Sequence, residues 1–99
     1  MELDSLDKAH FDPLLDQTFE VVFVDGRLEL TLIEIKALGG ETVPDAKRKP
    51  FSVTFLGPAR PLLPQRIYPL EHPELGRHEI FLVPMGPAKG GMQYEAVFT

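Results

Sequence analysis

The fold is decided by the stretch His78-Glu-Ile-Phe-Leu-Val-Pro-Met-Gly-Pro-Ala-Lys-Gly-Gly-Met-Gln-Tyr-Glu-Ala-Val-Phe-Thr99, in which two apolar runs flank a connection rich in glycine and proline. Apolar runs joined by such a connection are typical of a β-hairpin. The most apolar residues of the chain, 80–83, lie in this hairpin beside Tyr94 and Phe98. Any core must therefore be built against this pair of strands, and Lys89-Gly90-Gly91 is the predicted turn.

A second hairpin is predicted between Thr18 and Lys36. Two alternating runs, 18–24 and 27–36, flank Asp25-Gly26, the dipeptide that best tolerates the positive φ angles of a type I′ turn. Pairing outward from this turn places six apolar side chains on one face of the hairpin. They are Phe19, Val21, Phe23, Leu28, Leu30 and Leu32.

The alternation of this second hairpin slips after Leu32. Ile33 and Ile35 carry apolar side chains, whereas Glu34 and Lys36 are polar. A slip of this kind indicates a β-bulge or a strong bend near Leu32-Ile33, which would let a small sheet curl and close.

Two more strands are predicted in the middle of the chain. Segment 51–55 alternates between apolar side chains that face the core and polar ones, among them Ser52, that face solvent. Three prolines make residues 57–64 a stiff connection. Residues 65–70 form a short fourth strand, which Pro69 confines to an edge or ends early because proline has no backbone donor.

A short helix is predicted near the start of the chain, before Pro13. Asp4 or Ser5 is the expected cap of its first turn. A helix of so few turns is not stable alone, so its stability must come from docking Leu6 and Phe11 on the sheet.

The length of 99 residues and the hydrophobic content of 43% suit a single domain, 1–99. We expect residues 1–15 to form the helix and a lead-in, and residues 16–99 to form a small antiparallel barrel or curled sheet of about six strands. The bulge and the shortage of strands for two full sheets favour a barrel over a sandwich. The predicted fold class is therefore all-β.

The net charge and the composition reduce the number of possible functions. The net charge of −5 argues against nucleic acid as a partner, because duplex binding depends on clustered Lys and Arg. The absence of cysteine excludes disulfides, thiolate metal sites and cysteine nucleophiles. The chain has neither a secretory signal pattern nor a long apolar run, so we expect a cytoplasmic protein without membrane contact.

The histidines His10, His72 and His78 are the only candidate metal or acid-base groups besides the carboxylates. His72 and His78 flank a predicted turn with glutamates nearby, so a zinc site is conceivable there, but their spacing matches no familiar ligand pattern. Surface histidines in a polar turn are the favoured interpretation. We therefore predict no metal, no cofactor and no catalytic residue, with a ligand-binding or enzymatic barrel near His72 and His78 as the alternative.

Apolar residues left on outer faces predict an interaction surface. If Phe81 and Val83 face the core, Ile80 and Leu82 point outward, and one short helix cannot cover a whole sheet. The aperiodic loop 37–50, with its basic run, is a second candidate contact. The predicted surface for a protein partner or for self-association comprises Val22, Val24, Lys47, Arg48, Lys49, Ile80, Leu82 and Val97.

Several segments together resemble a bacterial family, domain of unknown function 6916. They are Leu15-Asp-Gln-Thr-Phe-Glu-Val, Pro50-Phe-Ser-Val-Thr-Phe-Leu-Gly-Pro, Gln65-Arg-Ile-Tyr, His72-Pro-Glu-Leu-Gly, Ile80-Phe-Leu-Val-Pro-Met-Gly-Pro and Tyr94-Glu-Ala-Val-Phe. The resemblance implies a small stand-alone protein without an assigned activity, and a non-enzymatic role in interaction or assembly, associated with phage-tail-like proteins. It carries over no catalytic residue, because the family has no defined site.

Overall fold

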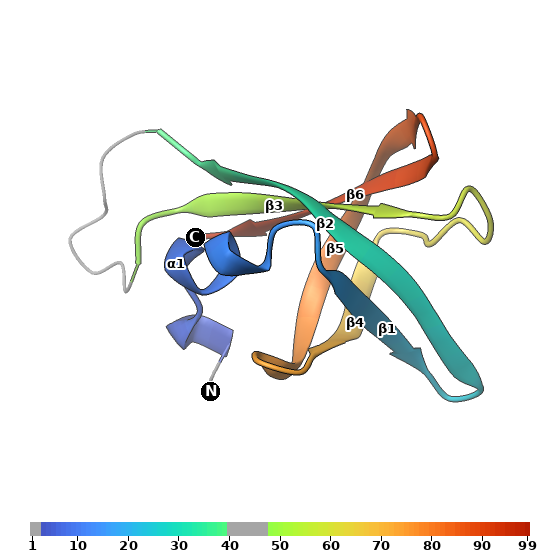
Figure 1. The fold of residues 1–99 in the computed structure, drawn as a ribbon, viewed down its shortest axis with the longest axis horizontal. Helices are drawn as coiled ribbons and strands as arrows, with labels where there is room; N and C mark the ends of the chain where they lie inside the picture. Colours follow the sequence, from blue (N-terminus) through green and yellow to red (C-terminus); the bar gives the residue numbers. More distant parts are fainter. Residues whose placement is uncertain (1–2, 40–47) are drawn as a thin grey trace.

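Six strands close into a barrel in the computed structural model, which describes residues 3–39 and 48–99 (Figure 1). In chain order they are β1 (Thr18–Phe23), β2 (Gly26–Ala37), β3 (Phe51–Gly57), β4 (Arg66–His72), β5 (Gly76–Ala88) and β6 (Gly91–Phe98). Around the barrel the order is β1-β2-β3-β6-β5-β4, and every neighbouring pair is antiparallel. The predicted all-β barrel is therefore confirmed.

The β1–β2 hairpin turns at Val24-Asp25, so the predicted turn at Asp25-Gly26 is wrong. Phe19 consequently pairs with Leu30 and not with Leu32. This moves the register by two residues, and side chains on strands alternate with a period of two, so each side chain keeps its predicted face. The apolar pattern could not distinguish these two registers.

The predicted bulge in β2 is confirmed. Leu32 pairs with Phe55 and Glu34 pairs with Thr54, so Ile33 is the extra residue. An extra residue bends its strand and increases the local twist, which helps six strands to close on themselves. Beyond the bulge, the side chain of Ile35 packs against the core.

The faces of β5 were predicted the wrong way round. Ile80 pairs with the buried Tyr68 of β4, and Ile80 and Leu82 point into the barrel with exposed fractions of 5% and 0%. Phe81 points outward and is 48% exposed, and Val83 is half-buried. Four consecutive apolar residues carry no alternation, so the run itself does not show which side chains are inside.

The outer face of β3 also departs from the prediction. Ser52 was expected to face solvent, but it is only 3% exposed. It lies between Lys36 of β2 and Val97 of β6 in the strand pairing. A short side chain between two longer neighbours on a sheet is shielded by them, even where its own strand points it outward.

The segment before β1 forms three short turns in place of one continuous helix. They are η1 (Leu3–Ser5), α1 (Lys8–Phe11) and η2 (Asp12–Leu14). Asp7 is the N-cap of α1, so neither Asp4 nor Ser5 caps it, and Pro13 lies inside η2. In the described residues no helix has the length and apolar character needed to cross a membrane.

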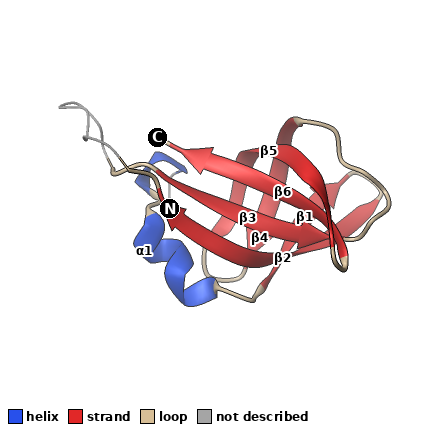
Figure 2. Ribbon diagram, turned by 90° about the horizontal axis from the view of Figure 1, so that it is seen from above, coloured by secondary structure: helices blue, strands red, loops and turns tan. Residues whose placement is uncertain are grey.

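These turns lie across one end of the barrel (Figure 2). Phe11 is fully buried there. Its ring centroid lies 6.2, 5.6 and 5.4 Å from the ring centroids of Phe19, Phe51 and Phe98, respectively. Leu6 is fully buried as well, so the predicted docking of Leu6 and Phe11 is confirmed. The N-terminal segment thus completes the core at this end.

The connection from β3 to β4 closes the opposite end. β3 and β4 lie on opposite sides of the barrel, so this connection has to cross the opening. Leu63 in the connection is buried, and its backbone N–H donates to the hydroxyl of Tyr94 at 2.9 Å. The hydroxyl of Tyr68 donates to the carbonyl of Pro64. Both ends of the barrel are therefore closed by the chain itself.

The barrel is joined by few residue pairs between β1 and β4. Glu20 pairs with Glu71 and Val21 pairs with Leu70. The next residue of β4 is Pro69, which has no backbone N–H to continue the ladder. Pro69 therefore lies where the β1–β4 pairing ends. The prediction that it ends the strand early or confines it to an edge is wrong, because β4 continues to His72 and pairs with β5 through Pro69↔Glu79 in a closed barrel.

We expect the Phe11→Ala variant to lower the free energy of unfolding by about 3–5 kcal/mol, because a fully buried ring is replaced by a cavity. Urea denaturation followed by circular dichroism measures this change. The matched control is Phe81→Ala, which removes a half-exposed ring and should cost less than about 1 kcal/mol. Equal losses in the two variants would show that the N-terminal segment is not part of the core.

A second prediction concerns alkaline pH. Burial raises the pKa of the Tyr68 phenol above its usual value of 10.0. The folded state therefore holds this proton more tightly than the unfolded state, so stability is complete below about pH 10 and falls as the pH rises further. The Tyr68→Phe variant should lose about 1 kcal/mol at neutral pH through the missing hydrogen bond.

Above about pH 10, the difference in stability between wild type and Tyr68→Phe should shrink, since only the wild type must then ionise this phenol. Urea denaturation of both proteins at neutral pH and above pH 10 tests this. A difference that stays constant over this range would contradict the prediction.

Candidate functional site

His72 and His78 hold the turn between β4 and β5. The Nδ1 atom of His72 accepts the backbone N–H of Glu74 at 3.0 Å, so its Nε2–H is the donor to Oε1 of Gln17, at 2.7 Å. The Nε2 atom of His78 lies 2.7 Å from the carbonyl oxygen of Leu75. Both rings are buried and serve local structure. Across residues 3–39 and 48–99, no three His, Asp or Glu side chains are grouped so as to hold a metal ion.

A charged cluster covers the junction of β1 and β4. Arg27 reaches across from β2, with its Nη1 atom 3.1 Å from Oε1 of Glu71 and 3.4 Å from Oε1 of Glu20. The hydrogen bond to Glu71, together with the charges of both carboxylates, raises the pKa of Arg27 above its usual value. A shallow depression of about 290 Å³ lies beside this cluster. Because the two carboxylates share one arginine, the cluster joins the strands electrostatically.

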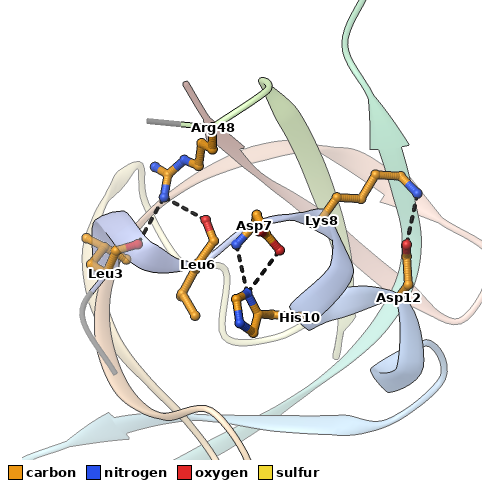
Figure 3. Close-up of polar contacts among 7 residues, drawn as sticks. All are labelled: Leu3, Leu6, Asp7, Lys8, His10, Asp12 and Arg48. Atoms are coloured by element: carbon orange, nitrogen blue, oxygen red, sulfur yellow. Dashed lines mark hydrogen bonds and ion pairs between the residues drawn. The ribbon is translucent and has the colours of Figure 1, made fainter. Parts of the chain in front are cut away.

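Arg48 holds the N-terminal segment in place (Figure 3). Its Nη1 atom donates to the carbonyl oxygens of Leu3 at 3.0 Å and Leu6 at 2.8 Å, and its guanidinium lies 5.2 Å from the ring centroid of Phe98. Sequence reasoning assigned Arg48 to a partner surface. The structure instead directs its side chain to contacts within the chain.

Three large apolar side chains form a row across the outer face of β4, β5 and β6. Ile67 pairs directly with Phe81, and their exposed fractions are 59% and 48%. Val97 on β6 is 53% exposed. We call Ile67, Phe81 and Val97 the apolar stripe. A groove of about 250 Å³ beside it is lined by all three and also by Leu3 and Arg48.

The groove lies where β5 and β6 separate. Their pairing extends from Ala88↔Gly91 only to Val83↔Glu95. Beyond it, residues 79–82 pair with β4 and residues 96–98 pair with β3. Figure 1 shows β5 and β6 diverging from there toward the end that carries the N-terminal segment. We call residues 79–82 and 96–98 the β5–β6 split.

The predicted partner surface is therefore dispersed over the molecule. Val97 belongs to the apolar stripe, whereas Ile80 and Leu82 lie beneath it in the core. Val24 is fully exposed at the tip of the β1–β2 hairpin, at the opposite end of the barrel. Val22 is half-buried and Lys49 is exposed. Lys47 and most of loop 37–50 lie outside the described residues.

Phe81 and Ile67 were missed as surface residues, although a signal for Phe81 was present. Arg77 and Glu79 precede Phe81 at intervals of two. Charged residues of a strand face solvent, so counting forward from them places Phe81 outside and Ile80 inside. The alternation of the polar residues was thus more informative than the apolar run that follows them.

The sequence of the chain matches a known protein family. It matches the family described as "Domain of unknown function (DUF6916)" over residues 6–98, nearly its whole length. Neither the comparison with curated proteins nor the comparison with solved structures gives a match. The matched range includes all six strands and α1, so the family resemblance and the barrel describe the same unit. The chain belongs to the family of domain of unknown function 6916.

Proposed function

We propose that this protein is a non-enzymatic interaction module that binds a protein partner through the apolar stripe. The observation that carries this proposal is the alignment of Ile67, Phe81 and Val97, each about half exposed, beside a groove. Contiguous apolar side chains rimmed by polar ones are typical of interaction sites, since covering them removes apolar surface from water.

The interior of the barrel supports the same proposal. It is filled by a continuous cluster of buried side chains contributed by the strands, the N-terminal segment and the β3–β4 connection. His72 and His78 are the residues of the alternative enzymatic hypothesis. Their ring nitrogens are engaged in hydrogen bonds within the chain, those of His72 with Glu74 and Gln17 and the Nε2 atom of His78 with Leu75. The outer surface is therefore the better candidate for contact with other molecules.

We further propose that the protein acts in the bacterial cytoplasm as a helper or structural component of a larger assembly, such as a phage-tail-like particle. The net charge of −5 favours solubility and disfavours nucleic acid as the partner. An accessory protein of this kind needs an exposed contact surface and no catalytic centre, and the apolar stripe provides such a surface.

Affinity purification from the source cells tests the proposal. We expect at least one protein to copurify with the wild type and to be reduced about tenfold or more with Phe81→Lys, because a charge in the centre of an apolar contact is costly to desolvate. Quantitative mass spectrometry measures the retained proteins. Light scattering of the purified protein reports whether a second copy is the partner.

The control variant is Val24→Lys, which changes an equally apolar and more exposed side chain at the opposite end of the barrel. It should retain the same partner as the wild type. Identical retained proteins for the wild type and Phe81→Lys, with a monomeric mass for both, would overturn the proposal. Thermal denaturation of each variant confirms that any loss of binding does not reflect unfolding.

A further inference from the structure

We propose that the groove beside the apolar stripe binds one apolar side chain of the protein partner, which carries an acidic group toward Arg48 and a basic group toward Glu79. This inference rests on the proposed function and specifies the chemistry of the partner. Its evidence is the size of the groove, the residues that line it and two charges that have no counter-charge.

The volume of the groove suits a side chain. It is about 250 Å³, whereas pockets for whole small molecules measure roughly 300–1,000 Å³. The groove is lined by the exposed side chains of Phe81 and Val97 and by Ile80 and Phe98, which are only 5% exposed. The buried pair therefore lies at its base and the exposed pair at its rim. An apolar side chain that enters from the outer face is removed from water there, while the strand pairing and the core stay as they are.

Arg48 provides a positive charge at the groove. Its half-buried side chain donates through Nη1 to the backbone carbonyls of Leu3 and Leu6, which are neutral acceptors (Figure 3). Within residues 3–39 and 48–99 it forms no ion pair, and its Nε atom is buried without a hydrogen-bond partner. A carboxylate binds arginine best through two parallel hydrogen bonds, and the edge formed by Nε and Nη2 is the one that the carbonyls leave open. The complementary group on the partner is therefore acidic.

Glu79 provides a negative charge at the same groove. It precedes Phe81 by two residues on β5, so its exposed side chain lies on the outer face beside the stripe. In the part of the chain that the structure describes, its carboxylate forms no ion pair with Arg48 or with another cation. An occupant that presents an acid to Arg48 and a base to Glu79 satisfies both charges, whereas two acids or two bases would bring like charges together.

Three displayed peptide libraries test this inference. All have an apolar residue at the centre, with charged residues two positions away on each side, because side chains at this spacing share a face of an extended segment. The first library has one acid and one base in either order, the second has two acids and the third has two bases. We expect the first to be enriched on the wild type at least about tenfold over the other two. Enrichment should disappear with Phe81→Lys and persist with the control variant Val24→Lys.

Reversal of one charge tests the role of Glu79. Its side chain is exposed, so Glu79→Lys should be folded like the wild type, which thermal denaturation checks. In this variant both charges at the groove are positive, and preference should change to the library with two acids. An unchanged preference for the library of mixed charge would overturn the inference.

The role of Arg48 is tested without mutation, because Arg48 also holds the N-terminal segment. The NMR signal of its Nε–H group reports on a bound carboxylate. The best peptide of the first library should shift this signal. The same peptide with its acid replaced by the matching amide should bind about tenfold more weakly and leave the signal in place. Equal binding and equal shifts for the two peptides would contradict the contact with Arg48.

The outcomes separate the inference from the proposed function. Preferential enrichment of the second or third library on the wild type, if it depends on Phe81, would overturn the occupant of mixed charge but retain the stripe as a binding site. A copurified partner that depends on Phe81, without enrichment of the first library, would have the same meaning. Absence of any binding that depends on Phe81, to libraries or to proteins, would overturn both.

Discussion

The burial of Phe11 is the contact on which the rest of the structure depends. Its ring joins aromatic side chains from three strands, Phe19 of β1, Phe51 of β3 and Phe98 of β6. The four residues of α1 are too few to form a stable helix alone, so this packing is what keeps the segment folded. In return, Phe11 supplies apolar surface that the strands need to bury at this end of the barrel.

The same arrangement accounts for the β5–β6 split. The N-terminal segment lies at the end of the barrel where β5 and β6 lose their mutual pairing. Strands that converged there would leave less room for Leu6 and Phe11, whereas diverging strands leave space that these side chains fill. Arg48 then binds the carbonyl oxygens of Leu3 and Leu6, which fixes the segment beside the split. The N-terminal segment thus closes the end of the barrel at which β5 and β6 are no longer paired with each other.

Sequence reasoning predicted the barrel because its signals were local and redundant. Turn residues, alternating segments and the slip after Leu32 all agreed, and an error of two residues in the first hairpin changed no face. The prediction of which β5 side chains face the core was wrong because residues 80–83 are all apolar. Their pattern fits either assignment of inner and outer faces. The burial of Ser52 could not be predicted from the sequence either. It depends on the neighbours Lys36 and Val97, which are identified only by the order of the strands in the barrel.

The apolar stripe could not be predicted for a related reason. It requires that Ile67, Phe81 and Val97 lie on adjacent strands, and β4 and β6 are neighbours of β5 only once the barrel order is known. The stripe has clear limits, because Ser52 pairs with Val97 and ends it on the β3 side, while Glu79 and Glu95 flank it along the strands. Since Phe11 and the interior side chains already form a complete core, the fold does not require large apolar groups at these outer positions. Their position on the outer face is thus explained neither by the core nor by the strand pairing, and an apolar centre with a polar rim is the composition on which the proposed interaction rests.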